Sequence, residues 1–179
     1  MTERIIIAGA GGQGIMLLGQ VLAEVAIKEN KHVTWLPAYG AEVRGGTAHC
    51  MVVISDQEIG SPFIDRADTL IIMNGPSFAK FRNRIKNQGL FIINSSLVSQ
   101  EKKKNAHILE YPFTDIALKL GNIRVANMVA VGCYLAKKKS MDINNVFKVI
   151  EEIAPRGKKD LIEINQQAVS FGRQLIKKQ

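Results

Sequence analysis

Three glycines with the spacing of an anion-binding turn stand at positions 9, 11 and 14, directly after a run of branched apolar residues and before a helical pattern. A buried strand, a tight turn and a helix N-terminus in this order form a concave set of backbone N–H groups that suits a phosphate or another anion. The candidate binding residues of this turn are Gly9, Gly11, Gly12, Gln13 and Gly14. A purely structural strand-to-helix corner has the same pattern, so the glycines alone leave both interpretations open.

A second set of candidate binding residues lies in residues 37–46, where the apolar periodicity breaks. It consists of Tyr39, Gly40, Glu42, Arg44, Gly45 and Gly46. A guanidinium can bind a phosphate or carboxylate through two parallel hydrogen bonds, and glycines allow close backbone approach. The segment therefore suits either a phosphate-bearing ligand or a subunit contact. In the alternative interpretation, Glu42 and Arg44 only pair with each other to order a surface loop.

The second segment lacks the acidic residue of a conventional NAD site. In dinucleotide-binding folds, an Asp or Glu at the end of the second strand binds the ribose hydroxyls. Leu36 and Pro37 occupy that place, and Glu42 comes several residues later. The sequence therefore does not support a conventional NAD site.

Neither a catalytic constellation nor a metal site is evident in the sequence. Cys50 and Cys133 are far apart and lack CxxC spacing, so they cannot hold an iron–sulfur cluster or zinc ion by themselves. His32, His49 and His107 are isolated, and each is interpreted as a structural or surface residue. We therefore assign no catalytic residue and no metal ligand.

Composition is typical of a compact globular domain, with 46% hydrophobic and 22% charged residues and a mean hydropathy of +0.03. A chain of 179 residues can bury about two thirds of its unfolded surface without a disulfide or metal. We therefore expect residues 1–179 to form a single domain. No signal peptide or membrane-spanning run is evident, so a soluble cytoplasmic protein without membrane contact is expected.

The net charge of +8 and the pI near 9.6 raise the question of nucleic-acid binding. The lysine clusters are short and dispersed, at residues 102–104, 137–139, 158–159 and 177–178. They are interpreted as a solvated edge, or as a basic surface for an acidic protein or a coenzyme A phosphate. No aromatic residues are interleaved with them, which argues against a stacking surface for single-stranded nucleic acid.

Alternating short apolar runs and helical periods predict an α/β fold. Strands are predicted at residues 4–8, 32–36, 47–54, 69–73, 90–93 and 108–111. Helices are predicted at residues 14–28, from Pro76, and at residues 115–120, 126–137, 143–153 and 161–176, with Asp142 and Asp160 as N-terminal signals of the last two. Together these elements predict a mainly parallel sheet flanked by helices, Rossmann-like in arrangement. Turn-forming residues 55–58 before Ile59 predict an added β-hairpin formed with residues 47–54.

Three blocks of this sequence, in this order and spacing, carry a family resemblance that covers nearly the whole chain. They are Gly9-Ala10-Gly11-Gly12-Gln13-Gly14, then Pro37-x-Tyr39-Gly40-x-Glu42-x-Arg44-Gly45-Gly46, then Val53-x-Ser55-x-x-x-Ile59-x-Ser61-Pro62. With the helix start Ala126-Asn127-Met128, the chain resembles the gamma subunit of 2-oxoacid:ferredoxin oxidoreductases.

The resemblance implies oxidative decarboxylation of a 2-oxoacid with coenzyme A, giving acyl-CoA and carbon dioxide, with electrons passed to ferredoxin. It implies alpha and beta partner subunits, and a delta subunit is a further candidate. Thiamine diphosphate, Mg and iron–sulfur clusters would be held by those partners, which agrees with the lack of cluster-type cysteines here. Coenzyme A is the ligand that this chain could contact, through its glycine turn and residues 39–46. Homodimer formation by the isolated chain is a further alternative.

The resemblance implies 2-oxoglutarate as the favoured substrate, with 2-oxoisovalerate, pyruvate and indolepyruvate as alternatives. A stand-alone nucleotide-binding or regulatory module is the competing hypothesis, and the missing ribose carboxylate argues against it. A basic nucleic-acid-binding protein is a third hypothesis, which the dispersed charge disfavours.

Overall fold

A computed structural model describes residues 1–38, 47–99, 106–155 and 157–177. The strands are β1 (Thr2–Ala10), β2 (His32–Ala38), β3 (Thr47–Ser55), β4 (Ala67–Ile72), β5 (Ile85–Asn94) and β6 (His107–Tyr111). The helices are α1 (Ile15–Lys28), α2 (Gly75–Phe81), α3 (Phe113–Lys119), α4 (Ala126–Lys138), α5 (Ile143–Ile153) and α6 (Lys159–Lys177), with short 3₁₀ turns η1 (Arg82–Arg84) and η2 (Ile123–Val125).

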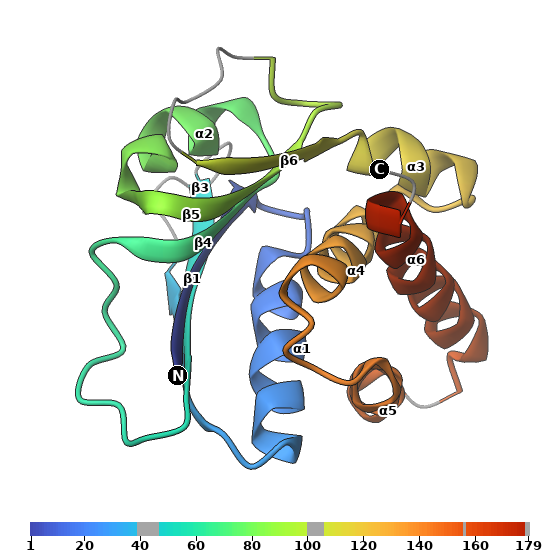
Figure 1. Cartoon of the computed structure of the whole chain (residues 1–179). Coiled ribbons are helices and arrows are strands. Elements are labelled where there is room, and N and C mark those ends of the chain that lie inside the picture. The colour runs from blue at the N-terminus through green and yellow to red at the C-terminus, as the bar shows by residue number, and fades with distance from the viewer. Residues whose placement is uncertain (39–46, 100–105, 156, 178–179) are drawn as a thin grey trace.

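The six strands form one sheet in the order β2-β3-β1-β4-β5-β6. β1, β4, β5 and β6 are parallel neighbours, whereas β3 is antiparallel to both β1 and β2. The predicted α/β class with a mainly parallel sheet and flanking helices is confirmed (Figure 1). All the parallel strands therefore end at one edge of the sheet, where ligands of open α/β sheets bind.

The hairpin is present but has different partners from those predicted. Residues 47–54 do not pair with the segment at Ile59, which has no strand structure. β3 pairs instead with β2, from His32 opposite Ser55 to Ala38 opposite His49. The turn-forming residues 55–58 lie in the connection from β3 to β4, because β3 already has β1 and β2 on its two sides.

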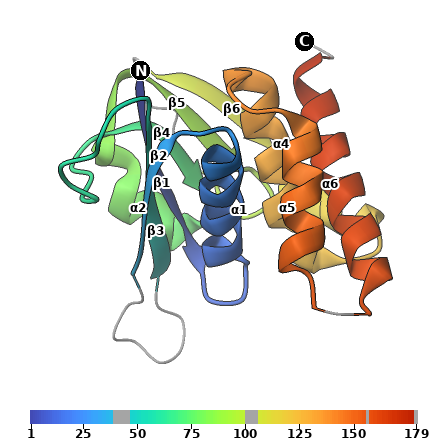
Figure 2. The ribbon, with the colours of Figure 1, turned by 90° about the horizontal axis from the view of Figure 1, so that it is seen from below.

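Helices cover the two faces of the sheet unequally. α1 and α4 lie against one face with α5 and α6 outside them, and α2 lies on the opposite face (Figures 1 and 2). β1 serves both layers, since Ile5 and Ile7 face the core with α1 and α4, and Ile6 and Ala8 face the core with α2. This two-sided burial explains why the strand is an unbroken apolar run.

Most predicted elements are confirmed, and their boundaries differ in several places. Asp142 caps α5 by accepting from Asn144 N at 3.0 Å. Asp160 lies inside the first turn of α6, which begins one residue earlier. The fifth strand begins at Ile85 instead of residue 90, with a register shift against β4 between Ala67 and Thr69.

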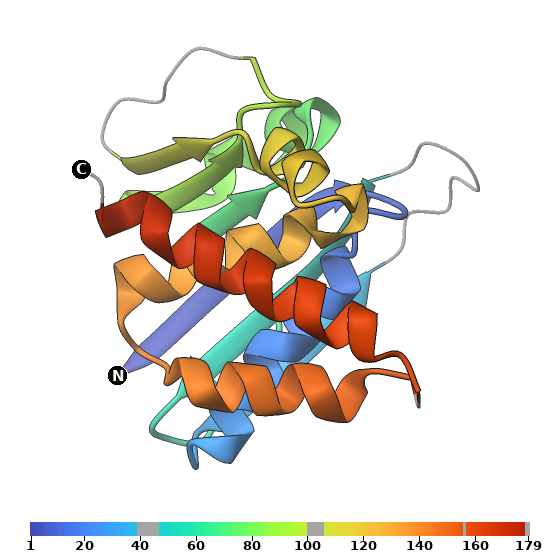
Figure 3. The same cartoon turned by 90° about the vertical axis from the view of Figure 1, so that its right-hand side faces the viewer.

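Two glycines let α4 and α6 cross in close contact (Figure 3). A Cβ on Gly132 would lie 2.0 Å from the Val169 carbonyl oxygen, and one on Gly172 would lie 2.0 Å from the Val129 carbonyl oxygen. The crossing therefore has no room for even a methyl group. In the part of the chain that the structure describes, no helix is long and apolar enough to cross a membrane.

We expect Gly172→Ala to lower the free energy of unfolding by about 3 kcal/mol, because overpacking forces apart backbones that already touch. The melting temperature should fall by on the order of 10 °C, measured by thermal unfolding followed by circular dichroism. Gly60→Ala is the matched control, since Gly60 is exposed and a Cβ there would meet no atom within 4 Å. Equal melting temperatures of the two variants would contradict the close crossing.

Candidate functional site

The glycine turn joins β1 to α1 at the edge where the parallel strands end. Gln13 N donates to the Ala10 carbonyl at 3.2 Å and closes the turn, while Gly12 (φ 86°) and Gly14 (φ 69°) take left-handed conformations. The Gln13 side chain then clamps the turn, because Oε1 accepts from Ala10 N at 2.7 Å and Nε2 donates to the Met73 carbonyl at 3.3 Å. The turn is thus held by hydrogen bonds between its own residues and by one hydrogen bond to the residue after β4.

The glycines of the turn serve two different purposes. A Cβ on Gly9 would lie 2.6 Å from Gln13 Oε1, and one on Gly14 would lie 2.3 Å from Asn127 Nδ2, so these two positions are occupied by tight packing. Gly11 and Gly12 are exposed, and a Cβ on either would meet nothing within 4 Å. Space for a ligand therefore lies next to Gly11 and Gly12. Gly9 and Gly14 instead allow the turn to pack closely on Gln13 and Asn127.

The N-terminus of α1 faces the same space. Gly14 caps this helix without a side-chain hydrogen bond, and the first turn has no acidic residue. The first N–H groups of a helix have no intrahelical acceptors and carry the positive end of the helix dipole. The turn and the helix together provide the electrostatic setting of an anion site.

Two buried amides that sequence reasoning missed hold the end of β4 and the start of α1 in place. Asn94, the last residue of β5, donates from Nδ2 to the Met73 carbonyl at 3.2 Å and to Thr114 Oγ1 at 2.9 Å. Asn127, at the start of α4, donates from Nδ2 to the Gly14 carbonyl at 3.1 Å. Both side chains are at most 1% exposed. An Asn at the end of a buried strand is the available sequence signal for Asn94. For Asn127 the signal is the helix start Ala126-Asn127-Met128, which accompanies the three blocks of the family resemblance.

The second predicted set lies outside the described residues. This applies to Tyr39, Gly40, Glu42, Arg44, Gly45 and Gly46. Their described neighbours lie at the edge that holds the glycine turn, because Thr47 pairs with Ala10 and Ala38 pairs with His49.

A lysine and a histidine lie beside this edge on the α2 side of the sheet. Lys80 Nζ donates to Thr47 Oγ1 at 3.1 Å, and Thr47 pairs with Ala10, the last residue before the glycines. Lys80 therefore places a cation next to the turn, which sequence reasoning did not single out. The His49 ring packs on Phe81, with 4.8 Å between ring centroids, and its buried Nδ1 has no hydrogen-bond partner among the described residues. Burial, and then the charges of Lys80 and Arg84, lower the pKa of His49 from 6.5.

Thiol and metal chemistry find little support in the described part of the chain. Cys50 and Cys133 are buried and unpaired, and burial raises the pKa of each thiol to about 12. A thiol with so high a pKa is a poor nucleophile at neutral pH. Within residues 1–38, 47–99, 106–155 and 157–177, no group of three or more His, Cys, Asp or Glu side chains could hold a metal ion.

Comparison with known families identifies the family of this chain. Residues 4–175 match the family model described as "Pyruvate ferredoxin/flavodoxin oxidoreductase". The chain belongs to this family. The resemblance recognised in the three blocks of sequence is thereby confirmed, and the glycine turn is the first of these blocks.

Two members of the family show how this chain relates to longer and shorter proteins. The ketoisovalerate oxidoreductase subunit VorA of Methanothermobacter marburgensis is 34% identical over 175 residues, which are 98% of this chain and 37% of VorA. The 2-oxoglutarate synthase subunit KorC of Methanocaldococcus jannaschii is 32% identical over 181 residues, covering 99% of this chain and 95% of KorC. The chain thus spans little more than a third of VorA and nearly all of KorC.

Solved structures share the fold. The gamma subunit of a keto/oxoacid ferredoxin oxidoreductase from Geobacter sulfurreducens superposes with a TM-score of 0.83 at 27% identity, over 96% of both chains. A 2-oxoglutarate:ferredoxin oxidoreductase from Magnetococcus marinus, solved with 2-oxoglutarate, coenzyme A and succinyl-CoA, gives a TM-score of 0.90 at 23% identity, over 99% of this chain and 31% of that one. The α/β architecture is therefore that of the family, both in a chain of similar length and in a much longer one.

We expect Gln13→Glu to destabilise the fold by about 1–2 kcal/mol. The carboxylate keeps an acceptor for Ala10 N but loses the Nε2 donor to the Met73 carbonyl and places a negative charge beside that oxygen. Urea unfolding measures the difference, with Gln174→Glu as control because Gln174 is exposed on α6. An equally small effect of both substitutions would contradict the clamping role of Gln13.

His49 is expected to titrate below pH 6.5, because burial and two nearby cations disfavour its charged form. The unfolded chain then binds a proton that the folded chain does not, so stability should fall as the pH drops below about 6.5 toward the folded-state pKa. NMR titration gives the pKa, and urea unfolding between pH 7 and pH 5 gives the stability. His49→Gln should reduce this part of the pH dependence. A His49 pKa above 6.5 would contradict the predicted effect of burial and of the two cations.

Proposed function

We propose that this chain is the gamma subunit of a multisubunit 2-oxoacid:ferredoxin oxidoreductase. The complex would decarboxylate a 2-oxoacid oxidatively in the presence of coenzyme A, giving acyl-CoA and passing electrons to ferredoxin. The observation that carries the proposal is the family match through residues 4–175, joined to the near-complete coverage of KorC. The chain spans 37% of VorA, and we propose that the remaining functions of such an enzyme lie outside residues 1–179.

Partner subunits would supply the redox and carbanion chemistry. Alpha and beta subunits, with delta as a further candidate, would hold thiamine diphosphate, Mg and the iron–sulfur clusters, and ferredoxin would accept electrons from the complex. Two features of the described residues support this division: both thiols are buried, and no group of metal-binding side chains comes together there.

The glycine turn would bind a phosphate of coenzyme A. Exposed Gly11 and Gly12, the uncapped N-terminus of α1 and the ammonium of Lys80 beside Thr47 support this role. Gln13 would act as a clamp and not as a backbone donor to the ligand, since its N–H already bonds to Ala10. Arg44 and its neighbours in residues 39–46 would complete the site, either on a phosphate or on a carboxylate of a partner.

2-Oxoglutarate is the substrate that we favour. The support is that KorC, a relative covered over nearly its full length, is named as a subunit of 2-oxoglutarate synthase. VorA is as similar over the shared region and is named for ketoisovalerate, so 2-oxoisovalerate is the first competitor, with pyruvate and indolepyruvate after it.

Anaerobic affinity purification of the tagged chain from its native cells is expected to recover partner subunits with thiamine diphosphate and iron–sulfur clusters. The eluate should reduce ferredoxin or a viologen only with coenzyme A, and fastest with 2-oxoglutarate among the four 2-oxoacids. Faster reduction with another 2-oxoacid would overturn the substrate proposal alone. Recovery of the inactive chain without partners would overturn the subunit proposal and favour a stand-alone nucleotide-binding module.

Gly11→Asp in the assembled enzyme is expected to raise the KM for coenzyme A by roughly tenfold or more, because the new carboxylate would repel a phosphate over the turn. Gly60→Asp is the matched control, since it makes the same change at another exposed and open glycine. Arg44→Ala should also raise this KM or weaken assembly. An unchanged KM in Gly11→Asp would remove the turn from the coenzyme A site while leaving the subunit assignment intact.

A further inference from the structure

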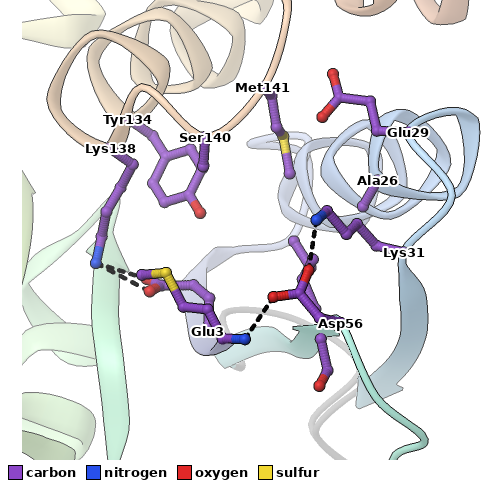
Figure 4. Close-up of a pocket in the computed structure, with 12 residues that line it drawn as sticks. Glu3, Ala26, Glu29, Lys31, Asp56, Tyr134, Lys138, Ser140 and Met141 are labelled. Carbon is purple, nitrogen blue, oxygen red and sulfur yellow. Dashed lines mark hydrogen bonds and ion pairs between the residues drawn. The ribbon is translucent and has the colours of Figure 1, made fainter.

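A second cavity lies at the end of the sheet opposite the glycine turn. Its volume is about 260 Å³, and it is lined by the start of β1, the end of β3, the C-terminal ends of α1 and α4, and the residues just before α5 (Figure 4). The cavity is partly open to solvent and large enough for a small organic ligand.

The interior of the cavity is mainly apolar. Ala26, Ile54 and Met141 line it together with the ring of Tyr134, which is 1% exposed. The Tyr134 side chain points into the cavity (Figure 4), and burial raises the pKa of its hydroxyl, so that this group is a neutral hydrogen-bond donor or acceptor. A ligand in this place would bury an apolar group against the interior.

Charged groups of both signs line the rim of the apolar interior in one ion pair and one group of three. Lys138 Nζ lies 2.9 Å from Glu3 Oε1 on one side, and Lys31 and the α-amino group of Met1 both pair with Asp56 on the other side (Figure 4). These contacts hold the pKa of Asp56 down to about 2, so its carboxylate is ionised at neutral pH. With Glu29, the lining has three cationic and three anionic groups, and its formal charge is zero.

We propose that this cavity binds a small zwitterion with an apolar side chain, the chemical class of the apolar α-amino acids. The ligand carboxylate bonds to Lys31 and its ammonium bonds to Asp56, so that insertion replaces one ion pair with two. The ligand side chain packs on Ala26, Ile54 and Met141. An amine without a carboxylate would leave Lys31 without its Asp56 partner, and a carboxylate without an ammonium would leave Asp56 with the Met1 amino group alone.

Isothermal titration calorimetry of the full chain with L-leucine and L-valine tests the proposal. A C-terminal tag keeps the α-amino group unmodified. We expect both amino acids to bind, and we expect roughly tenfold or weaker binding of 4-methylpentanoate, which lacks the ammonium, and of 3-methylbutylamine, which lacks the carboxylate. Glycine, which has both charges and no side chain, should also bind at least about tenfold more weakly.

Two lysines of similar surroundings provide the matched variants. Lys31→Gln should weaken L-leucine binding roughly tenfold, whereas Lys28→Gln should leave it unchanged, because Lys28 pairs with Glu152 outside the cavity. Circular dichroism verifies that both variants fold. Absence of binding by L-leucine and L-valine, equal affinity for 4-methylpentanoate, or an unchanged affinity in Lys31→Gln would overturn the proposal.

Discussion

The hydrogen bond from Asn127 Nδ2 to the Gly14 carbonyl is the contact on which the arrangement of this molecule depends most. The same carbonyl accepts the first intrahelical bond of α1 from Leu18 N at 2.9 Å, so a single oxygen fixes the start of both α1 and α4. The contact requires a glycine, because a Cβ on Gly14 would lie 2.3 Å from the amide nitrogen. The same hydrogen bond thereby couples the backbone of the glycine turn to the packing of α1 and α4.

The two ends of the sheet have different electrostatic characters, although α1 and α4 run between them. At the glycine turn, the strand ends are held by neutral amides of Gln13, Asn94 and Asn127, and the helix end is uncapped. At the opposite end, Glu3, Asp56 and two lysines form ion pairs around an apolar cavity. Oriented dipoles without a counter-charge favour an anion, whereas balanced ion pairs repel neither sign and favour a ligand that carries both.

Much of the fold could be predicted from the sequence because local pattern and long-range packing agree. Ile5 to Ala8 form an unbroken apolar run because the strand is covered on both faces, and α1 shows the helical stripe of a one-sided element. The pairing of β3 was predicted wrongly because turn-forming residues 55–58 indicate a change of direction without indicating the next neighbour. That choice is decided by long-range contacts, since β1 and β2 already occupy both edges of β3.

The candidate site was predictable only in its backbone. Glycines at strand-to-helix spacing indicate the turn, because tight turns and close approach demand glycine. Asn94, Asn127 and Lys80 could not be assigned in the same way, because an amide or a lysine is compatible with many surroundings and acquires its role from residues that are distant in sequence. Asn94 and Thr114 are 20 residues apart, and Gly14 and Asn127 are 113 apart.

The residues at the end of β2 distinguish a site for a phosphate from a site for a whole dinucleotide. A dinucleotide needs both the glycine turn and a carboxylate at the end of the second strand, where the ribose hydroxyls lie. Here β2 ends in Leu36, Pro37 and Ala38, and the first two are exposed apolar side chains without a hydrogen-bonding group. The glycine turn typical of a nucleotide site is thus present, and the described end of β2 has no carboxylate for a ribose. An apolar strand end beside an uncapped helix N-terminus favours the proposed ligand, whose phosphate would enter the turn while another chain would make its remaining contacts, as a subunit that shares its ligand with partners requires.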